Sequence, residues 1–207
     1  MRILYGTTNQ AKLDSMKPIA EELGFELIGL KELGKPVPKV DESGRNPLEN
    51  AELKARAYYQ AFSMPVFSCD SGLYFEGLAE EQQPGTHIRR VDGLEMTDQQ
   101  MIAYYSGLAS AHGGCLCGRY RNAIYLVMDE DTSFWSMDES IATESFLLTD
   151  VAHEKQVPGF PLDSLSKDIG TGEYYYDMPE RVLCDSTGQG IRRFFEEAFK
   201  SYQTKKL

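Results

Sequence analysis

The stretch Phe67-Ser68-Cys69-Asp70-Ser71-Gly72-Leu73 places an acid three residues after the apolar run of residues 64–67. The apolar run predicts a buried strand, and Asp70, Ser71 and Gly72 are residue types that favour turns, so we expect the strand to end at them. In open α/β sheets the carboxyl ends of the strands form the edge where ligands bind. Asp70 is therefore a candidate functional residue, although a plain Asp-Ser-Gly turn has the same sequence.

The composition is that of an ordinary globular protein. The 207 residues are 42% hydrophobic and 26% charged, which is enough apolar material to bury the core of one domain. The formal net charge of −11 argues against a nucleic-acid partner and against an acidic membrane surface, because both would repel the protein.

The sequence shows four cysteines, no signal peptide and no apolar run long enough to cross a bilayer. These features predict a cytoplasmic protein with free thiols. Cys115 and Cys117 have a C-x-C spacing that could suggest a metal site. Because no second pair or nearby histidine accompanies them, we interpret them as loop or strand residues.

The N-terminal segment has the pattern of an α/β unit: residues 2–5 predict a strand, and a helical pattern follows the polar loop of residues 6–12. The N-terminus of a helix offers free backbone N–H groups, so Thr7, Thr8 and Asn9 are candidates to hold a phosphate. Lys12 would add a full positive charge. The alternative is that Thr8 or Asn9 only caps the helix.

A second acid, Glu42, precedes a strong amphipathic helix. We expect Asn46 to cap this helix, Pro47 to occupy its first position and Phe62 to end it. Glu42 is either a surface acid or a second carboxylate that meets Asp70 at one magnesium ion. Magnesium prefers hard oxygen ligands and takes one or two carboxylates together with substrate phosphates.

The second half of the sequence predicts further strands and helices. Residues 73–78 predict a strand beyond the acid, residues 119–128 a core strand, and residues 134–137 with 145–148 an edge hairpin. Thr97 is expected to cap a helix that runs through Leu108, and residues 191–199 to form a closing helix. Arg89 and Arg90, which precede Thr97, are candidates to neutralise phosphate or to form surface ion pairs.

Four segments taken together resemble the inosine triphosphate pyrophosphatase family, whose members remove nonstandard purine nucleoside triphosphates. Residues 7–12 resemble its T-x-N-x-x-K. Residues 42–44 together with residues 50–55 resemble its E-x-G and the N-A-x-x-K-A helix that follows it. Residues 70–73 resemble its D-S-G-L, and residues 84–90 its P-G-x-x-x-x-R. The order and spacing of all these segments agree with the family across the first half of the chain.

The resemblance implies a fold and a set of roles. The fold is α/β, with a long mixed central sheet flanked by helices, in two lobes around a central cleft. Residues 1–207 would form a single domain of this kind, and a homodimer is the common assembly. Asp70 would be the general base and a Mg²⁺ ligand, with Glu42 as the second acidic metal contact. The substrate-binding residues implied are Thr7, Thr8, Asn9, Lys12, Lys54, Ser71, Arg90, Phe160, Asp163 and Arg181.

The chemistry implied is the hydrolysis of a nucleoside triphosphate to the monophosphate and pyrophosphate. Water activated by Asp70 would attack the α-phosphorus, while Mg²⁺ and Lys12 offset the charge of the triphosphate and of the departing pyrophosphate. Lys12 is thus a catalytic candidate beside Asp70.

The second half departs from the family where the base would be recognised. Residues 159–163 keep Phe160 as a stacking surface and Asp163 as an acceptor, but Leu162 replaces an aromatic residue. The family's His-Arg pair is replaced by Ser186 and Thr187, and Arg181 stands where the family has a lysine. Cys69 replaces the first acid of the family's D-D-S-G. Two alternatives therefore stay open: the same reaction on another modified or pyrimidine nucleotide, or a catalytically weak nucleotide-binding or regulatory protein. The presence of Asp70, Glu42 and Lys12 together argues against the second alternative.

Overall fold

A computed structural model describes residues 1–91, 93–178 and 186–205, and for Ser186 only its backbone. The chain forms two compact units. Unit 1 comprises Met1–Ser71, Arg121–Ala142 and Asp185–Leu207, and unit 2 comprises Gly72–Tyr120 and Thr143–Cys184. Within the described residues, no helix has both the length and the apolar content that a membrane span requires. Whether the chain is a single domain stays a prediction.

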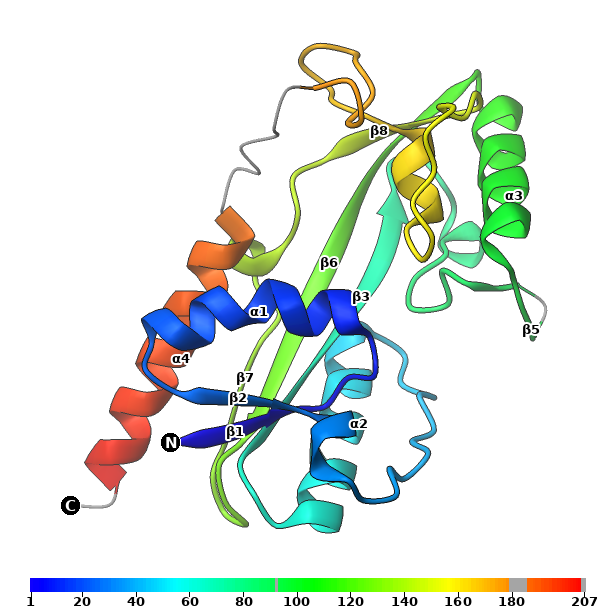
Figure 1. The fold of residues 1–207 in the computed structure, drawn as a ribbon. Helices are drawn as coiled ribbons and strands as arrows, with labels where there is room; N and C mark the ends of the chain where they lie inside the picture. The colour runs from blue at the N-terminus through cyan, green and yellow to red at the C-terminus, as the bar shows by residue number, and fades with distance from the viewer. Residues whose placement is uncertain (92, 179–185, 206–207) are drawn as a thin grey trace. The chain divides into compact units, whose positions relative to one another are not determined.

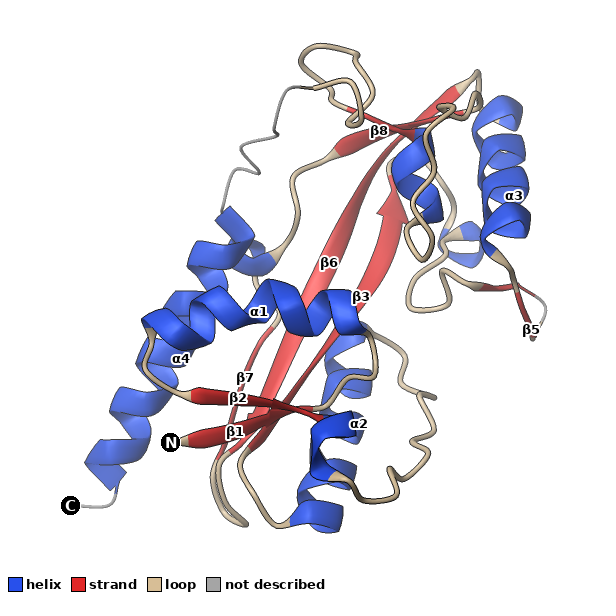
Figure 2. Cartoon of the chain, viewed as in Figure 1, coloured by secondary structure: helices blue, strands red, loops and turns tan. Residues whose placement is uncertain are grey.

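The sheet of unit 1 is built around β1 (Arg2–Tyr5), which pairs in parallel with β2 (Glu26–Gly29) and with β3 (Val66–Phe75). β6 (Cys115–Val127) follows β3 in the strand order, and β7 (Ser133–Ser136) pairs antiparallel with β6. Helices, strands and loops of the described residues are distinguished by colour in Figure 2. The other elements of unit 1 are α1 (Gln10–Glu22), α2 (Pro47–Phe62), α4 (Ser186–Lys205) and the short 3-10 helices η1 (Leu30–Leu33) and η3 (Glu139–Ile141).

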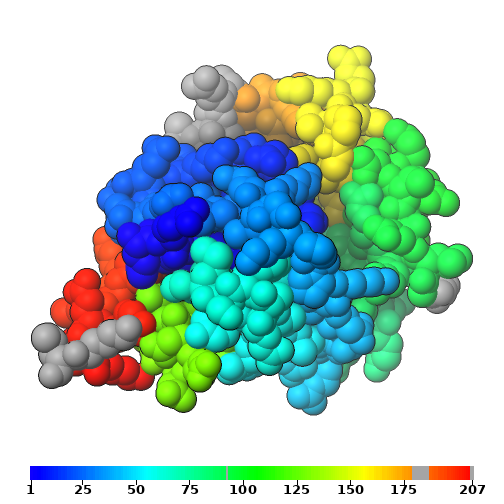
Figure 3. Space-filling view, turned by 60° about the horizontal axis from the view of Figure 1, so that its bottom comes forward, coloured from blue at the N-terminus to red at the C-terminus, as the bar shows by residue number. Residues whose placement is uncertain are grey.

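The two faces of this sheet are covered by different helices, because successive side chains of a strand point to opposite faces. Ile3 and Tyr5 of β1 pack in one core cluster with residues of α1 and α4, and these two helices lie beside each other in Figure 1. Leu4 of β1 packs in the other cluster with Ala51, Ala55 and other residues of α2. Figure 3 shows the three chain segments of unit 1 side by side at the surface, coloured blue to cyan, yellow-green and red.

Unit 2 is organised around α3 (Asp98–Ala111), whose N-terminus carries the expected cap: Thr97 and Gln100 form a capping box. Met101, Ile102 and Tyr105 of α3 pack against Leu73 and Phe75 of β3. β8 (Phe146–Thr149) pairs antiparallel with β6 and with β9 (Ser166–Lys167). The remaining elements are a two-stranded sheet of β4 (Arg90–Val91) and β5 (Leu94–Glu95), and the 3-10 helices η2 (Glu80–Gln82) and η4 (Pro161–Leu165).

The predicted α/β class, a mixed sheet with flanking helices, is confirmed, but the prediction that β3 ends at Asp70 is wrong. β3 continues without interruption to Phe75 and joins the two strands expected on either side of the acid. Beyond the acid, Leu73 exchanges two backbone hydrogen bonds with Gly85 (2.9 and 3.0 Å). Within the run, the Ser71 hydroxyl donates to Asn122 Oδ1 at 2.7 Å. These partners far along the chain satisfy the segment as a strand, so the local turn preference of Asp-Ser-Gly does not decide its conformation.

The predicted edge hairpin is also wrong. β7 and β8 form as strands, but each pairs with a different half of β6 and they do not pair with each other. Because β6 is 13 residues long, it offers enough length for both partners. Of the two interpretations of Cys115 and Cys117, loop or strand, the structure shows the strand, because β6 begins at Cys115 and not at residue 119 as predicted. Both are free thiols, as is Cys69.

Candidate functional site

Asp70, Lys54 and Glu42 meet in unit 1. Lys54 Nζ donates to Asp70 Oδ1 at 2.8 Å and to Glu42 Oε2 at 3.0 Å. The side chains of Lys54 and Asp70 are only 11% and 13% exposed, whereas Glu42 is 49% exposed. β3 supplies the buried acid, α2 the lysine, and the loop before α2 the more exposed acid. The two carboxylates that the sequence predicts to share a cation therefore do face a common positive group, the Lys54 ammonium.

Lys54 stays charged in this setting. Burial by itself lowers the pKa of Lys54, but the charges and hydrogen bonds of Asp70 and then of Glu42 outweigh it and leave the pKa above its usual value. A buried ammonium requires such partners, because leaving either kind of charge unpaired in a protein interior is costly.

Asn50 completes the network, and the sequence-based reasoning missed it. Its side chain is buried (2% exposed). Asn50 Nδ2 donates to Asp70 Oδ2 at 3.1 Å, and Asn50 Oδ1 accepts from the backbone N–H of Gly44 at 2.8 Å. Asn50 and Lys54 are four residues apart on α2, so one face of the helix delivers both side chains to the same carboxylate. This i, i+4 spacing was the available sequence signal.

The loop before α1 serves first of all as a helix cap. Asn9 Oδ1 accepts from the backbone N–H groups of Ala11 (2.9 Å) and Lys12 (3.3 Å), so the capping interpretation holds for Asn9. Thr7 Oγ1 in turn accepts from Asn9 N at 3.2 Å, and Thr8 is exposed. Two of the N–H groups that could receive a phosphate are therefore already paired with a side chain of the protein.

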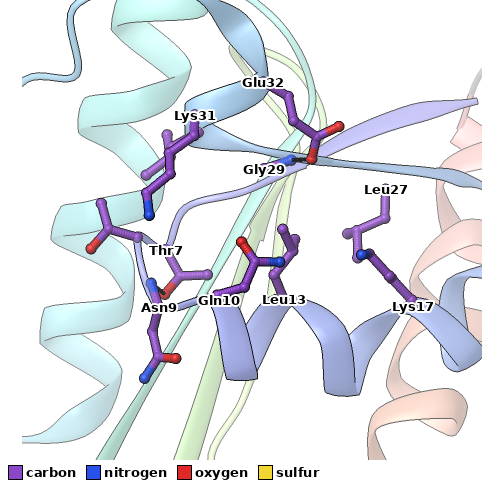
Figure 4. A pocket seen from close by; sticks show the side chains of 11 residues that line it. Thr7, Asn9, Gln10, Leu13, Lys17, Leu27, Gly29, Lys31 and Glu32 are labelled. Carbon is purple, nitrogen blue, oxygen red and sulfur yellow. Dashed lines mark hydrogen bonds between the residues drawn. The ribbon is translucent and has the colours of Figure 1, made fainter. Parts of the chain in front are cut away.

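A pocket of about 320 Å³ opens beside this loop. Thr7, Thr8, Asn9 and Gln10 line it on one side and the segment from Leu27 to Glu32 on the other. The side chain of Lys31 extends toward the loop that carries Thr7 (Figure 4). The Glu32 carboxylate is already engaged in a hydrogen bond, because its Oε1 accepts from Gly29 N at 2.9 Å.

Cys69 lies beside Asp70 on β3 and is held as a neutral thiol. Burial raises the pKa of Cys69, and the opposing effects of the Tyr5 hydrogen bond and of the Lys12 charge are smaller. Burial also raises the pKa of Tyr5 well above its usual value, and the neighbouring Cys69 raises it further. Lys12, half-buried on α1, thus acts electrostatically on the residue next to Asp70.

Ser71 lies next to the acid, but its hydroxyl proton is already donated to Asn122 Oδ1. Asn122 is fixed in turn, because its Nδ2 donates to the backbone oxygen of Ile141 at 2.8 Å. Ser71 can therefore accept a further hydrogen bond without any rearrangement, whereas donating one requires the release of Asn122.

The candidates for base and phosphate contacts in the second half belong to unit 2. Phe160 is 41% exposed, and Arg90 in β4 and Asp163 in η4 are exposed as well. Arg89 forms an ion pair with Asp98 at 2.7 Å, so the surface ion-pair interpretation is confirmed for Arg89. Arg181 lies outside the described residues.

A divalent cation can be tested against the donors present. Two carboxylates converge on one point, the Lys54 ammonium, and hard oxygens of this kind suit magnesium. No group of three or more His, Cys, Asp or Glu side chains within the described ranges could hold a metal by itself. The residues therefore fit a cation that takes one or two ligands from the protein and the others from water and phosphate oxygens.

Comparison with known proteins identifies relatives. The model of the Ham1 family matches residues 3–133. A protein of Aquifex aeolicus (strain VF5) named dITP/XTP pyrophosphatase is 40% identical over 104 residues, which are 49% of this chain and 48% of the relative. A protein of the same name from Anaeromyxobacter dehalogenans is 31% identical over 120 residues, 58% of this chain and 50% of the relative. The matched part thus spans about half the length of these relatives.

Solved structures show that the similarity in fold extends over nearly the whole chain. The Ham1 protein of Staphylococcus aureus has a TM-score of 0.71 at 22% identity and covers 95% of this chain and 99% of its own. A HAM1 protein from Coxiella burnetii has a TM-score of 0.75 at 20% identity and covers 96% of this chain and 100% of its own. Since the family model matches well over half of the chain and contains all four motif regions, the chain belongs to the Ham1 family.

Proposed function

We propose that this protein is a divalent-cation-dependent nucleoside triphosphate pyrophosphatase acting on noncanonical purine nucleotides. The observation that most supports this proposal is that Asp70 and Glu42, although distant along the chain, both contact the Lys54 ammonium. The relatives named dITP/XTP pyrophosphatase support the substrate class. A purely structural ion pair does not require a second acid that remains half exposed.

The proposed reaction assigns one task to each side chain. Asp70 accepts a proton from water, whose oxygen forms a bond to the α-phosphorus while the bond from that phosphorus to the bridging oxygen of the pyrophosphate breaks. Lys54 holds the buried Asp70 carboxylate in place through their ion pair. Lys12 offsets the negative charge of the triphosphate, and the hydroxyls of Thr7 and Thr8 help to orient it at the start of α1. Glu42 and Asp70 would hold Mg²⁺, which when bound neutralises the triphosphate and polarises its oxygens.

A different base preference is the second candidate, and one observation favours it. Thr187 stands at one of the two positions where the resembled motif has a His-Arg pair. Its Oγ1 donates to the backbone oxygen of Ala142 at 3.0 Å, so its one hydrogen-bond proton is used within the protein. A site that lacks donors for a purine keto oxygen loses the discrimination that such donors provide.

We also propose that the protein is a homodimer and that it is cytoplasmic. Analytical sedimentation would test the oligomeric state, and cell fractionation would test the location.

The test measures pyrophosphate release from dITP, XTP, dATP and dCTP with Mg²⁺, and again with EDTA in excess. We expect cleavage of dITP or XTP in preference to the others and none with EDTA. Asp70→Asn should lose at least about 10²-fold in kcat, because proton abstraction contributes about 10²- to 10⁴-fold. Asp131→Asn removes an exposed acid and serves as the control. Release from dCTP alone would favour the second candidate, and unchanged turnover in Asp70→Asn would refute the assignment of the base.

A further inference from the structure

Asn50 has only one way to orient its amide. The backbone N–H of Gly44 can only donate, so it must face Asn50 Oδ1, as it does at 2.8 Å. The amide nitrogen is then forced toward Asp70 Oδ2 at 3.1 Å. Because the side chain is 2% exposed, water has little access to compete with either bond. The backbone of the loop thus determines that Asn50 donates to Asp70 and not the reverse.

The close approach of that loop depends on glycine at position 44. A Cβ atom on Gly44 would lie 2.6 Å from Asn50 Oδ1 and 2.8 Å from Asn50 N, far inside normal contact distance. Glu42 is two residues upstream in the same loop. Asn50 therefore ties the loop that carries one acid to the other acid on β3.

The two oxygens of Asp70 are held by two different groups. Oδ1 accepts from Lys54 Nζ and Oδ2 from Asn50 Nδ2, and both donors lie on one face of α2. Rotation of the carboxylate about its own axis would break both bonds. With Oδ2 occupied by a neutral amide, Oδ1 is the oxygen that faces the position shared with Glu42.

We propose that Asn50 is a positioning residue for the reaction. Its amide fixes the orientation of the Asp70 carboxylate. It also holds the loop that carries Glu42 in a fixed position relative to that carboxylate, so that the base and the second acid face the same point. This role rests on the proposed function, since Asn50 itself need not touch a substrate. It differs from a role in stability alone, which the bond to Gly44 would satisfy without any contact to Asp70.

A double-mutant cycle on thermal stability tests the contact without any assay of activity. Asn50→Asp keeps an acceptor for Gly44 N–H but places a carboxylate against Asp70. We expect Asn50→Asp to lower Tm by about 5 °C in the wild-type background. In the Asp70→Asn background it should lower Tm by less than about 1 °C, because the amide introduced at position 70 can donate to the carboxylate introduced at position 50. Equal losses in both backgrounds would overturn the proposal.

Folding of the variants also gives a result. If Asn50→Asp alone does not fold, recovery of folded protein in the double variant shows the same coupling. If neither folds while Asp70→Asn does, the proposed pairing is wrong.

Steady-state kinetics separates positioning from packing. We expect Asn50→Asp to lower kcat by about 10²-fold with KM within about threefold, because a displaced reacting group affects the transition state more than binding. The control is Gln60→Glu, which makes the same amide-to-carboxylate change on an exposed part of α2 and should retain wild-type kinetics. An unchanged kcat in Asn50→Asp would refute the positioning role. If the wild-type protein cleaves no triphosphate, the proposed function fails, and the stability cycle alone decides on Asn50.

Discussion

At the scale of single residues, burial rather than distance distinguishes Lys54 from the other lysines. The Lys54–Asp70 and Lys17–Asp14 pairs both have N–O distances of 2.8 Å. Lys54 is 11% exposed, whereas both members of the surface pair are 53% exposed. Water screens the surface pair, so its contribution to stability is small, whereas the loss of one partner inside the protein leaves an uncompensated charge.

Lys54→Met should therefore destabilise the protein by about 3 kcal/mol, because Asp70 would remain buried without its cation. Lys17→Met, the matched control, should change the free energy of unfolding by less than about 0.5 kcal/mol. Urea denaturation of the wild-type protein and the two variants, fitted in the same way, measures both changes in the free energy of unfolding. Equal losses in the two variants would mean that Asp70 gains no special stability from Lys54.

At the scale of elements, the sequence predicts best the features that depend on neighbouring residues. β1 spans Arg2–Tyr5 as expected, and α2 spans Pro47–Phe62 with Asn46 as its cap. Caps and helical periodicity are local signals, so no distant partner is needed to recognise them. The end of β3 was mispredicted for the opposite reason: the strand is maintained by partners such as Asn122, 51 residues from Ser71.

The candidate site divides in the same way. Glu42, Lys54 and Asp70 lie in recognisable motifs, and the structure brings them together. Asn50 was missed as a functional residue because its importance comes from a contact with Asp70, 20 residues away. A buried amide looks the same in sequence whether it satisfies a loop or a carboxylate.

α4 offers the clearest prediction at this scale. Phe195 is fully buried, and its ring lies 5.2 Å from that of Phe25 and 5.1 Å from that of Phe67. Phe195→Ala should cost about 3–5 kcal/mol, since it removes a large apolar side chain and leaves a cavity between α4 and the sheet. Glu196→Ala, one position along and exposed, should have little effect. The comparison uses chemical denaturation, and a loss under about 1 kcal/mol in Phe195→Ala would mean that α4 is not part of the cooperative core.

At the scale of the whole molecule, the net charge of −11 contrasts with the substrate class proposed. A negatively charged protein repels a triphosphate at long range, so binding relies on a few positive groups close to the ligand. The Cys69 thiol fits this requirement. Because burial raises its pKa, it adds no negative charge beside Asp70 at neutral pH.

Both units also bury groups that can lose a proton only at high pH. Burial raises the pKa of Tyr5 in unit 1 and of Tyr105 and Tyr120 in unit 2 above the usual value of 10.0. Lys54 has a raised pKa as well, since its two acids outweigh the effect of burial. In each case the folded protein retains its proton at a pH where the unfolded chain releases it. All four groups therefore contribute stability that is fully present below about pH 10 and is lost as the pH rises through the folded-state pKa values.

We accordingly expect the free energy of unfolding to fall steeply above pH 10, by about 1.4 kcal/mol per pH unit for each proton released on unfolding. Urea denaturation at pH 8, 9, 10 and 10.5 measures this slope, with reversibility checked at each pH. Tyr105→Phe should reduce the slope above pH 10, because it removes one of the titrating hydroxyls. It should also lower stability by about 1 kcal/mol at pH 8, where the hydroxyl donates to the backbone oxygen of Ile88 at 2.8 Å. A stability that stays constant from pH 8 to 10.5, or a slope that Tyr105→Phe leaves unchanged, would show that these buried groups are not linked to folding.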